Sequence, residues 1–256
     1  MFAWRGRLGL ISPTQRGKGF HYWYRMAPEG VEIVPSYIGF RRGERDQFTA
    51  GLDRAAELAA DLVGALNCDL VVVSGTPPFL LQGLDFERAW RERLAAQIGR
   101  PVVTAMEPGA IALQTIGAHR VAIATYYGDE LNEAIAACFA RFGLESVILG
   151  GFSLTGESEG LYTTPLRALD NASSADVYRY CKAGVLGAGS AVDALYINGG
   201  GWDYVPAMDP LERDLKIPVI GATNAEMWLT YRKLHVSHRV EGVGVLMRDY
   251  YDADVA

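Results

Sequence analysis

The strongest constraint on the fold is an internal repeat. Three segments of the first half of the chain recur in the same order in the second half. RLGLISPT (residues 7–14) matches RVAIATYY (120–127), DLVVVSGTPP (69–78) matches DALYINGGGW (193–202), and residues 100–112 match residues 217–228. In the first two pairs a short apolar run leads into a small or polar turn, as a buried parallel strand does. The long spacing excludes a solenoid and indicates a duplicated α/β unit.

The repeat predicts where the secondary structure lies. We expect mainly parallel strands, in which the two glycine turns, after residues 69–73 and 193–198, face each other across a pseudo-twofold axis. The other predicted strands are residues 8–12, 31–38, 101–105, 121–125, 146–149 and 218–222. The predicted helices are residues 48–66, 86–98, a helix that follows Glu107-Pro-Gly and runs through Gln114, and residues 131–142, 177–186, 210–215 and 225–234. For residues 21–24 we expect a helix or a long loop, and for 150–174 a lid, a binding loop or a partly helical segment.

The triple glycine, Gly199 to Gly201, is the most distinctive turn. Glycine adopts backbone angles closed to other residues and lets a ligand approach the main chain. The N–H groups of such a turn can hold an anion. An ordinary tight turn between a strand and a helix explains the glycines equally well, so the turn alone decides nothing.

The net charge and the composition limit the classes of binding partner and the cellular compartment to be expected. The net charge of −6 argues against nucleic acid or an anionic membrane as the main partner. The first strand follows so closely on Met1 that we expect no signal peptide, and no apolar run has the length of a membrane span. Three cysteines without metal-type spacing fit reduced thiols in a cytoplasmic protein.

The order and spacing of these segments are similar to those of the aspartate/glutamate racemase superfamily, and within it of the arylmalonate decarboxylase and maleate cis-trans isomerase branch. The resemblance extends from Leu8 to about Leu234. It is carried by Gly75-Thr76, TYYGDELNE (125–133), LTG (154–156), Gly199-Gly200, and IPVI (217–220) with Trp228. It implies an α/β fold of two pseudo-symmetric α/β lobes with mainly parallel sheets and the active site in the inter-lobe cleft. Residues 1–116 with about 225–256 would form the N-terminal lobe, and residues 117–224 the C-terminal lobe.

The resemblance also implies a pocket of hydrogen-bond donors around one substrate carboxylate. The donors would be the hydroxyls of Thr76 and Tyr127 and the backbone amides of Gly199 and Gly200. Losing CO₂ or a proton beside a carboxylate develops an enediolate, and each preorganised donor is worth about 10²–10³ in rate. Asp203, just past the glycine turn, is a further catalytic candidate. The expected substrate-binding residues are Pro13, Thr14, Arg16, Gly75, Pro77, Gly201 and Trp202.

With these residues in place, the resemblance implies a cofactor-free carbon–carbon lyase that decarboxylates a small substituted malonate-type acid. Two alternatives stay open: a cis-trans isomerase or racemase-like enzyme using non-thiol acid/base groups, and a non-catalytic carboxylate-binding protein. No metal or cofactor is expected. The expected partner is the small carboxylic acid, without nucleic acid or membrane, and a homo-oligomer is a further possibility.

The sequence departs from the family pattern at its most important positions. Racemases and maleate isomerases have a cysteine at each of the two turns, and decarboxylases retain the second. Here these positions are Gly75 and Gly199, which disfavours thiol chemistry. Pro77 replaces a hydroxyl residue of the decarboxylase pattern and, having no N–H, removes a donor. The candidates for handling protons instead are Tyr127, Asp203, Tyr204, Glu107, His21 and Glu157.

Overall fold

A computed structural model describes residues 3–15, 17–188 and 191–254 of the chain. These residues form two four-stranded sheets in which all paired strands are parallel. The first sheet has the order β2-β1-β3-β4, with β1 (Gly6–Ser12), β2 (Val31–Tyr37), β3 (Leu70–Val73) and β4 (Val102–Thr104). The second has the order β6-β5-β7-β8, with β5 (Arg120–Thr125), β6 (Glu145–Gly151), β7 (Ala194–Ile197) and β8 (Val219–Gly221). The same strand order in both halves confirms the predicted α/β fold of two similar units.

The repeat extends to individual hydrogen bonds at the start of the central strands. Asp69 Oδ2 accepts a hydrogen bond from the N–H of Arg7 at 2.8 Å. In the second half, Asp193 Oδ1 accepts from the N–H of Arg120 at 3.0 Å. In each half, therefore, an aspartate before the inner strand satisfies the backbone at the start of its neighbour, which fixes how the two strands align.

Helices connect and cover the strands. They are α1 (Gly17–Arg25), α2 (Arg45–Gly64), α3 (Pro77–Leu80), α4 (Leu84–Ile98), α5 (Glu107–Thr115), α6 (Asp129–Ala140), α7 (Leu166–Leu169), α8 (Ser174–Gly187), α9 (Val205–Leu215), α10 (Ala222–Lys233) and α11 (Val245–Asp249). Most predicted helices are present with shifted ends, because apolar spacing marks the buried face whereas capping sets the first turn. Thus α8 begins earlier than predicted, after a capping box between Ser173 and Asp176. The short helix α3 is not among the predicted helices.

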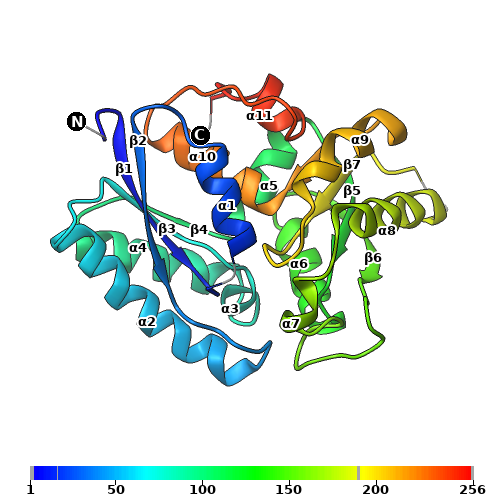
Figure 1. Cartoon of the computed structure of the whole chain (residues 1–256), viewed down its shortest axis with the longest axis horizontal. Helices are drawn as coiled ribbons and strands as arrows, with labels where there is room; N and C mark the ends of the chain where they lie inside the picture. Colours follow the sequence, from blue (N-terminus) through cyan, green and yellow to red (C-terminus); the bar gives the residue numbers. More distant parts are fainter. Residues whose placement is uncertain (1–2, 16, 189–190, 255–256) are drawn as a thin grey trace.

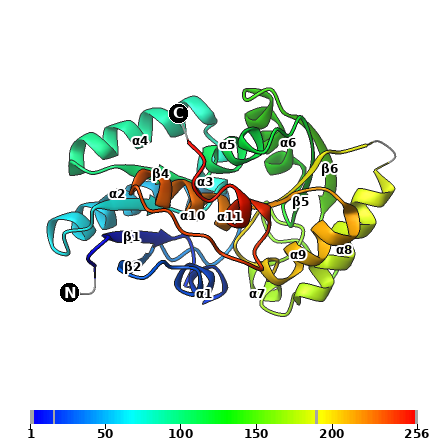
Figure 2. The ribbon, with the colours of Figure 1, turned by 90° about the horizontal axis from the view of Figure 1, so that it is seen from above.

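The two sheets lie side by side, and α10 and α5 pack against each other between them (Figures 1 and 2). Helix α10 contacts β3, β4 and α1 as well as β8 of the second sheet. The C-terminal part of the chain thus returns to the first half. The assignment of lobe boundaries near residues 116 and 225 stays a prediction.

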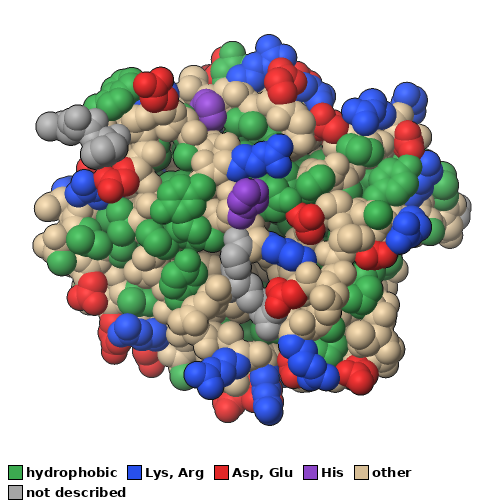
Figure 3. All heavy atoms as spheres, in the orientation of Figure 1, with side chains coloured by type: hydrophobic (Ala, Val, Ile, Leu, Met, Phe, Trp, Pro, Cys, Tyr) green, Lys and Arg blue, Asp and Glu red, His purple; other side chains and the backbone are tan. Residues whose placement is uncertain are grey.

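The surface carries charges of both signs. On the face shown in Figure 3, basic and acidic side chains are interspersed, with apolar side chains between them. Among the described residues, none of the helices combines the length and apolar character that crossing a membrane requires.

Candidate active site

A cavity of about 70 Å³ lies where the turns after β3 and β7 approach each other. The first turn contributes Ser74, Gly75 and Thr76, and the second contributes Asn198 and the triple glycine. The carboxyl ends of parallel strands are where open α/β sheets bind ligands. The two matched turns of the repeat therefore share one cavity.

The two turns have a glycine with nearly the same positive φ angle at the same position. Gly75 has φ +106° and Gly199 has φ +102°, values that strain any residue with a Cβ atom. A Cβ atom at Gly199 would also overlap the ring of Tyr126. Any side chain at position 199, a thiol included, requires Tyr126 to move.

Replacing Gly199 with alanine is expected to lower the free energy of unfolding by about 2–4 kcal/mol, from backbone strain and overpacking together. Gly200→Ala is the matched control, because a Cβ atom there would meet its nearest neighbour, Thr223 Oγ1, only at 4.0 Å. It should change the free energy by less than about 1 kcal/mol. Urea unfolding of both variants measures the difference, and equal losses would contradict the positions given to the two glycines.

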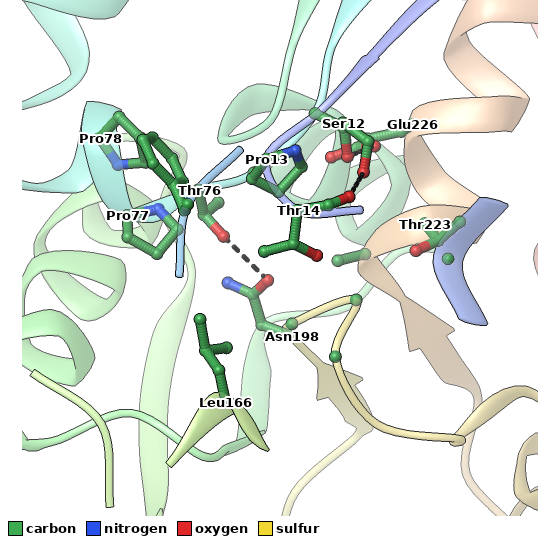
Figure 4. A pocket seen from close by; sticks show the side chains of 18 of the residues that line it. Ser12, Pro13, Thr14, Thr76, Pro77, Pro78, Leu166, Asn198, Thr223 and Glu226 are labelled. Atoms are coloured by element: carbon green, nitrogen blue, oxygen red, sulfur yellow. Dashed lines mark hydrogen bonds between the residues drawn. The ribbon is translucent and has the colours of Figure 1, made fainter. Parts of the chain in front are cut away.

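Thr76 and Tyr127 meet across the cavity although they lie in different halves of the chain. Their hydroxyl oxygens are 3.3 Å apart. Thr76 Oγ1 also donates to Asn198 Oδ1 at 3.1 Å, as the dashed line between these two residues in Figure 4 shows. Both hydroxyls are buried. Three hydrogen-bonding side chains therefore converge at one point between the turns.

Tyr127 is held as a neutral donor. Its side chain is 2% exposed and stacks on the ring of Tyr162, with ring centroids 5.3 Å apart. Burial raises the pKa of the Tyr127 phenol well above its usual range, and the neighbouring tyrosines add to this effect. The phenol keeps its proton at neutral pH and can donate it in a hydrogen bond to an anion.

The backbone of the second turn can supply further donors. Within the described residues, no carbonyl or side chain accepts a hydrogen bond from the N–H of Gly199 or Gly200. Gly201 lines the same cavity, as do Pro13, Thr14, Gly75 and Pro77. The structure thus brings together most of the residues singled out in the sequence.

The remaining wall is largely apolar. Its side chains come from β1, α1, α2, the segment before α2, and the start of α7: Leu10, Phe20, Trp23, Phe40, Phe48 and Leu166. Tyr162 and Leu166 belong to the long polar stretch 150–174, which therefore contributes to the cavity wall and includes the short helix α7. A polar corner thus faces a water-excluding wall.

Two of the predicted site residues lie away from the cavity lining. Trp202 is buried and packs against Tyr126 and Phe152, with ring centroids 5.6 and 5.2 Å apart. Asp203 accepts hydrogen bonds from the Tyr22 hydroxyl and from Ser174 Oγ, the latter at 2.7 Å. Proximity in sequence to the glycine turn misled the prediction, because the chain turns away to begin α9. The predicted Arg16 lies outside the described residues.

The other residues predicted to donate or accept protons, apart from Tyr127, also lie outside the cavity lining. Glu107 forms ion pairs with Arg88 and Arg91; burial alone would raise its pKa, but these arginines lower it below the usual range. Glu157 is paired with Arg167 on the surface, and His21 is exposed. Tyr204 is buried and accepts from the N–H of Thr223 at 2.8 Å. Of the six candidates, only Tyr127 lines the cavity.

All three cysteines are buried away from the cavity. Burial raises the pKa of Cys68 to about 11 and that of Cys138 to about 12, and it also raises that of Cys181. None of them lines the cavity. They are packing residues in the thiol form, as their positions in the sequence indicate.

The cavity also contains an acid that is not among the residues predicted from the sequence. Glu226 on α10 lines it, is 3% exposed and accepts a hydrogen bond from Ser74 Oγ at 2.7 Å (Figure 4). Asn198 is not among them either. The sequence signal for Glu226 is a single carboxylate in the otherwise apolar run Ala225 to Leu229. A glutamate is rarely buried unless it has a partner or a functional role.

Comparison with known proteins identifies the family. A model of the arylmalonate decarboxylase family matches residues 8–247. The chain belongs to the arylmalonate decarboxylase family. The arylmalonate decarboxylase of Bordetella bronchiseptica is 27% identical over 226 residues, which cover 86% of this chain and 87% of that protein.

Solved structures of this family and of maleate isomerases share the fold. A liganded variant of arylmalonate decarboxylase has a TM-score of 0.81 at 22% identity, covering 96% of this chain and 99% of that chain. The Nocardia farcinica maleate cis-trans isomerase has a TM-score of 0.82 at 17% identity, covering 96% and 98%. The maleate isomerase of Pseudomonas putida S16 with maleate has 0.80 at 19%, covering 94% and 97%. Decarboxylases and isomerases are thus built on this one fold.

Proposed function

We propose that this protein is a carbon–carbon lyase that decarboxylates a small substituted malonate-type acid through an enediolate, without a cofactor. The observation that carries the proposal is the convergence of Thr76, Tyr127 and the Gly199–Gly200 turn on one buried cavity. Membership of the arylmalonate decarboxylase family supports the same reaction class.

The chemistry follows from where charge develops. When the bond between the α-carbon and one carboxyl carbon breaks, CO₂ leaves and the electron pair spreads onto the retained carboxylate. The neutral Tyr127 phenol, the Thr76 hydroxyl and the amides of Gly199 and Gly200 would donate to these two oxygens. Donors fixed before the reaction stabilise the developing charge more than water does. The apolar wall, including Phe48 and Leu166, would surround the departing carboxylate and favour its loss as neutral CO₂.

A second candidate is an isomerase or racemase-like enzyme acting through the same enolate. The likeness of fold to the maleate isomerases favours it. One of those isomerases was solved as a variant with a covalently bound succinylcysteine intermediate. No cysteine lines the cavity of the present chain, so addition of a thiol is not available here. An isomerase would need an acid or base of another kind, which ranks this reading second.

Incubation with a panel of aryl- and alkyl-substituted malonates, one or two substituents each, tests the proposal by measuring CO₂ release. We expect release from at least one malonate and the corresponding monocarboxylic acid as product. Deuterium exchange beside a carboxylate without CO₂ release would favour the isomerase. A malonate that raises the melting temperature but is recovered unchanged would indicate a carboxylate-binding protein instead.

A further inference from the structure

Glu226 is the carboxyl group in the cavity to which the reaction above gives no role. Its helix, α10, enters from the side opposite Thr76, and in Figure 4 the side chain extends toward Ser12 while Thr76 and Asn198 meet across the cavity. Glu226 Oε2 accepts from Ser74 Oγ at 2.7 Å, and the N–H of Gly75 donates to the same carboxyl group. The first of the two turns therefore fixes its position.

The surroundings of Glu226 keep it protonated near neutral pH. Burial is the largest effect and raises its pKa to about 8, although the bonds from Ser74 and Gly75 oppose the shift. Glu87 on α4, itself a buried glutamate whose pKa is raised to about 7, raises the pKa of Glu226 further. The other polar side chains that line the cavity or interact electrostatically with Glu226 carry no charge. They are Ser12, Thr14, Thr76, Tyr126, Tyr127, Tyr162, Tyr196, Asn198, Tyr204 and Thr223.

Decarboxylation needs one proton at the α-carbon after CO₂ has left. The positions where the resembling enzymes carry thiols are Gly75 and Gly199, and Tyr127 has too high a pKa to lose its proton readily. Glu226 is the remaining carboxyl group that lines the cavity among the described residues. An acid whose pKa lies near the working pH is the most effective proton donor.

We propose that Glu226 is the general acid of the site and protonates the substrate α-carbon from the side of the Ser74–Gly75 turn. The inference rests on the proposed function. The Glu226 O–H bond breaks as a new C–H bond forms with the electron pair of the enediolate. Glu226 is left as a carboxylate and regains its proton from water, so each turnover consumes one proton and releases one CO₂.

Only one of the two repeated halves has an acid at this position. In the match of residues 100–112 with 217–228, Gly109 on α5 corresponds to Glu226. A Cβ atom at Gly109 would overlap the ring of Tyr196, so that half has no room for an acid. A proton delivered from one side only gives a product of a single configuration when the malonate carries two different substituents.

The test uses a malonate that carries one aryl and one methyl substituent and that the wild-type protein decarboxylates. For Glu226→Gln we expect kcat to fall about 10²–10⁴-fold. The residual product should lose its enantiomeric excess, because water then protonates the enediolate from both sides. Glu226→Asp should keep the excess at a kcat reduced about tenfold or more. Loss of enantiomeric excess separates proton delivery from a merely structural role.

Glu87→Gln is the matched control, because Glu87 is also a buried glutamate, with a pKa raised to about 7 by burial, but lies outside the cavity. At pH 6, where Glu226 stays protonated with or without the effect of Glu87 on its pKa, this variant should keep both kcat and enantiomeric excess. Wild-type kcat and excess in Glu226→Gln would overturn the role of Glu226 while leaving the proposed function intact. If Glu226→Gln does not fold, an unchanged kcat in Glu226→Asp overturns it equally. CO₂ release by no malonate in the wild-type protein would overturn the proposed function itself, and this inference with it.

Discussion

Replacing Tyr127 with phenylalanine is expected to lower kcat for decarboxylation by about 10²–10³-fold, the value of one preorganised donor to a developing oxyanion. The substitution removes the hydroxyl that lies 3.3 Å from Thr76 Oγ1. It keeps the ring that stacks on Tyr162, so the fold should not change. KM should change less than kcat, because the enediolate gains more from this donor than the ground-state carboxylate does.

The matched control is Tyr178→Phe. The Tyr178 hydroxyl bonds to Asp214 and Lys182 at the surface, away from the cavity. This variant should retain wild-type kcat. A Tyr127→Phe enzyme within about threefold of wild-type kcat would show that the phenol does not stabilise the transition state.

The second large effect expected is on the pH dependence of kcat. A general acid acts only while protonated, and burial raises the pKa of Glu226 to about 8. The rate should therefore be nearly constant below about pH 7 and fall tenfold per unit well above about pH 8. A profile of kcat from pH 6 to 10 measures this, and the fall should be absent from the residual activity of Glu226→Gln. A rate that rises with pH through this range would contradict an acid role.

Glu226 also affects how the stability of the fold depends on pH. The direction is opposite to that expected for an ion-paired carboxylate, which stabilises the fold when it is ionised. Because the pKa of Glu226 is higher in the folded than in the unfolded chain, the folded state binds the proton more tightly. The contribution of the protonated Glu226 to the free energy of unfolding is therefore complete below the pKa of an ordinary glutamate. It is lost as the pH rises through about 8. Urea unfolding at pH 6 and pH 9 should show this loss in the wild-type protein and a smaller one in Glu226→Gln.

The sequence predicted the architecture well because the repeat is carried by local features. An aspartate, an apolar run and a small turn specify a strand and its end, and Asp69 and Asp193 make equivalent hydrogen bonds in the structure. The convergence of Thr76 and Tyr127 could be inferred only through the family resemblance, since the residues are 51 positions apart. Spacing along the chain contains no information on that contact.

The errors of the site prediction at Asp203 and Glu226 also arise because spacing along the chain does not show which residues meet in space. Asp203 follows the glycine turn directly, yet its carboxylate bonds to Tyr22 and Ser174 because the chain leaves the cavity there. Glu226 lies in an apolar helix, so the sequence marks it as an unusual buried carboxylate, but nothing in the sequence shows that it meets a cavity rather than solid core. A buried carboxylate becomes visible as a functional candidate only when its neighbours are known.

A structure with a bound arylmethylmalonate, or with the monocarboxylic acid derived from it, would show directly whether the donors of the cavity hold the substrate carboxylate. We expect one carboxylate within about 2.7–3.2 Å of the Tyr127 hydroxyl and of an N–H of the Gly199–Gly200 turn, with the α-carbon facing Glu226. A ligand bound instead in the open groove beside Arg88 and Arg91, with the Thr76–Tyr127 contact unbroken, would contradict this expectation.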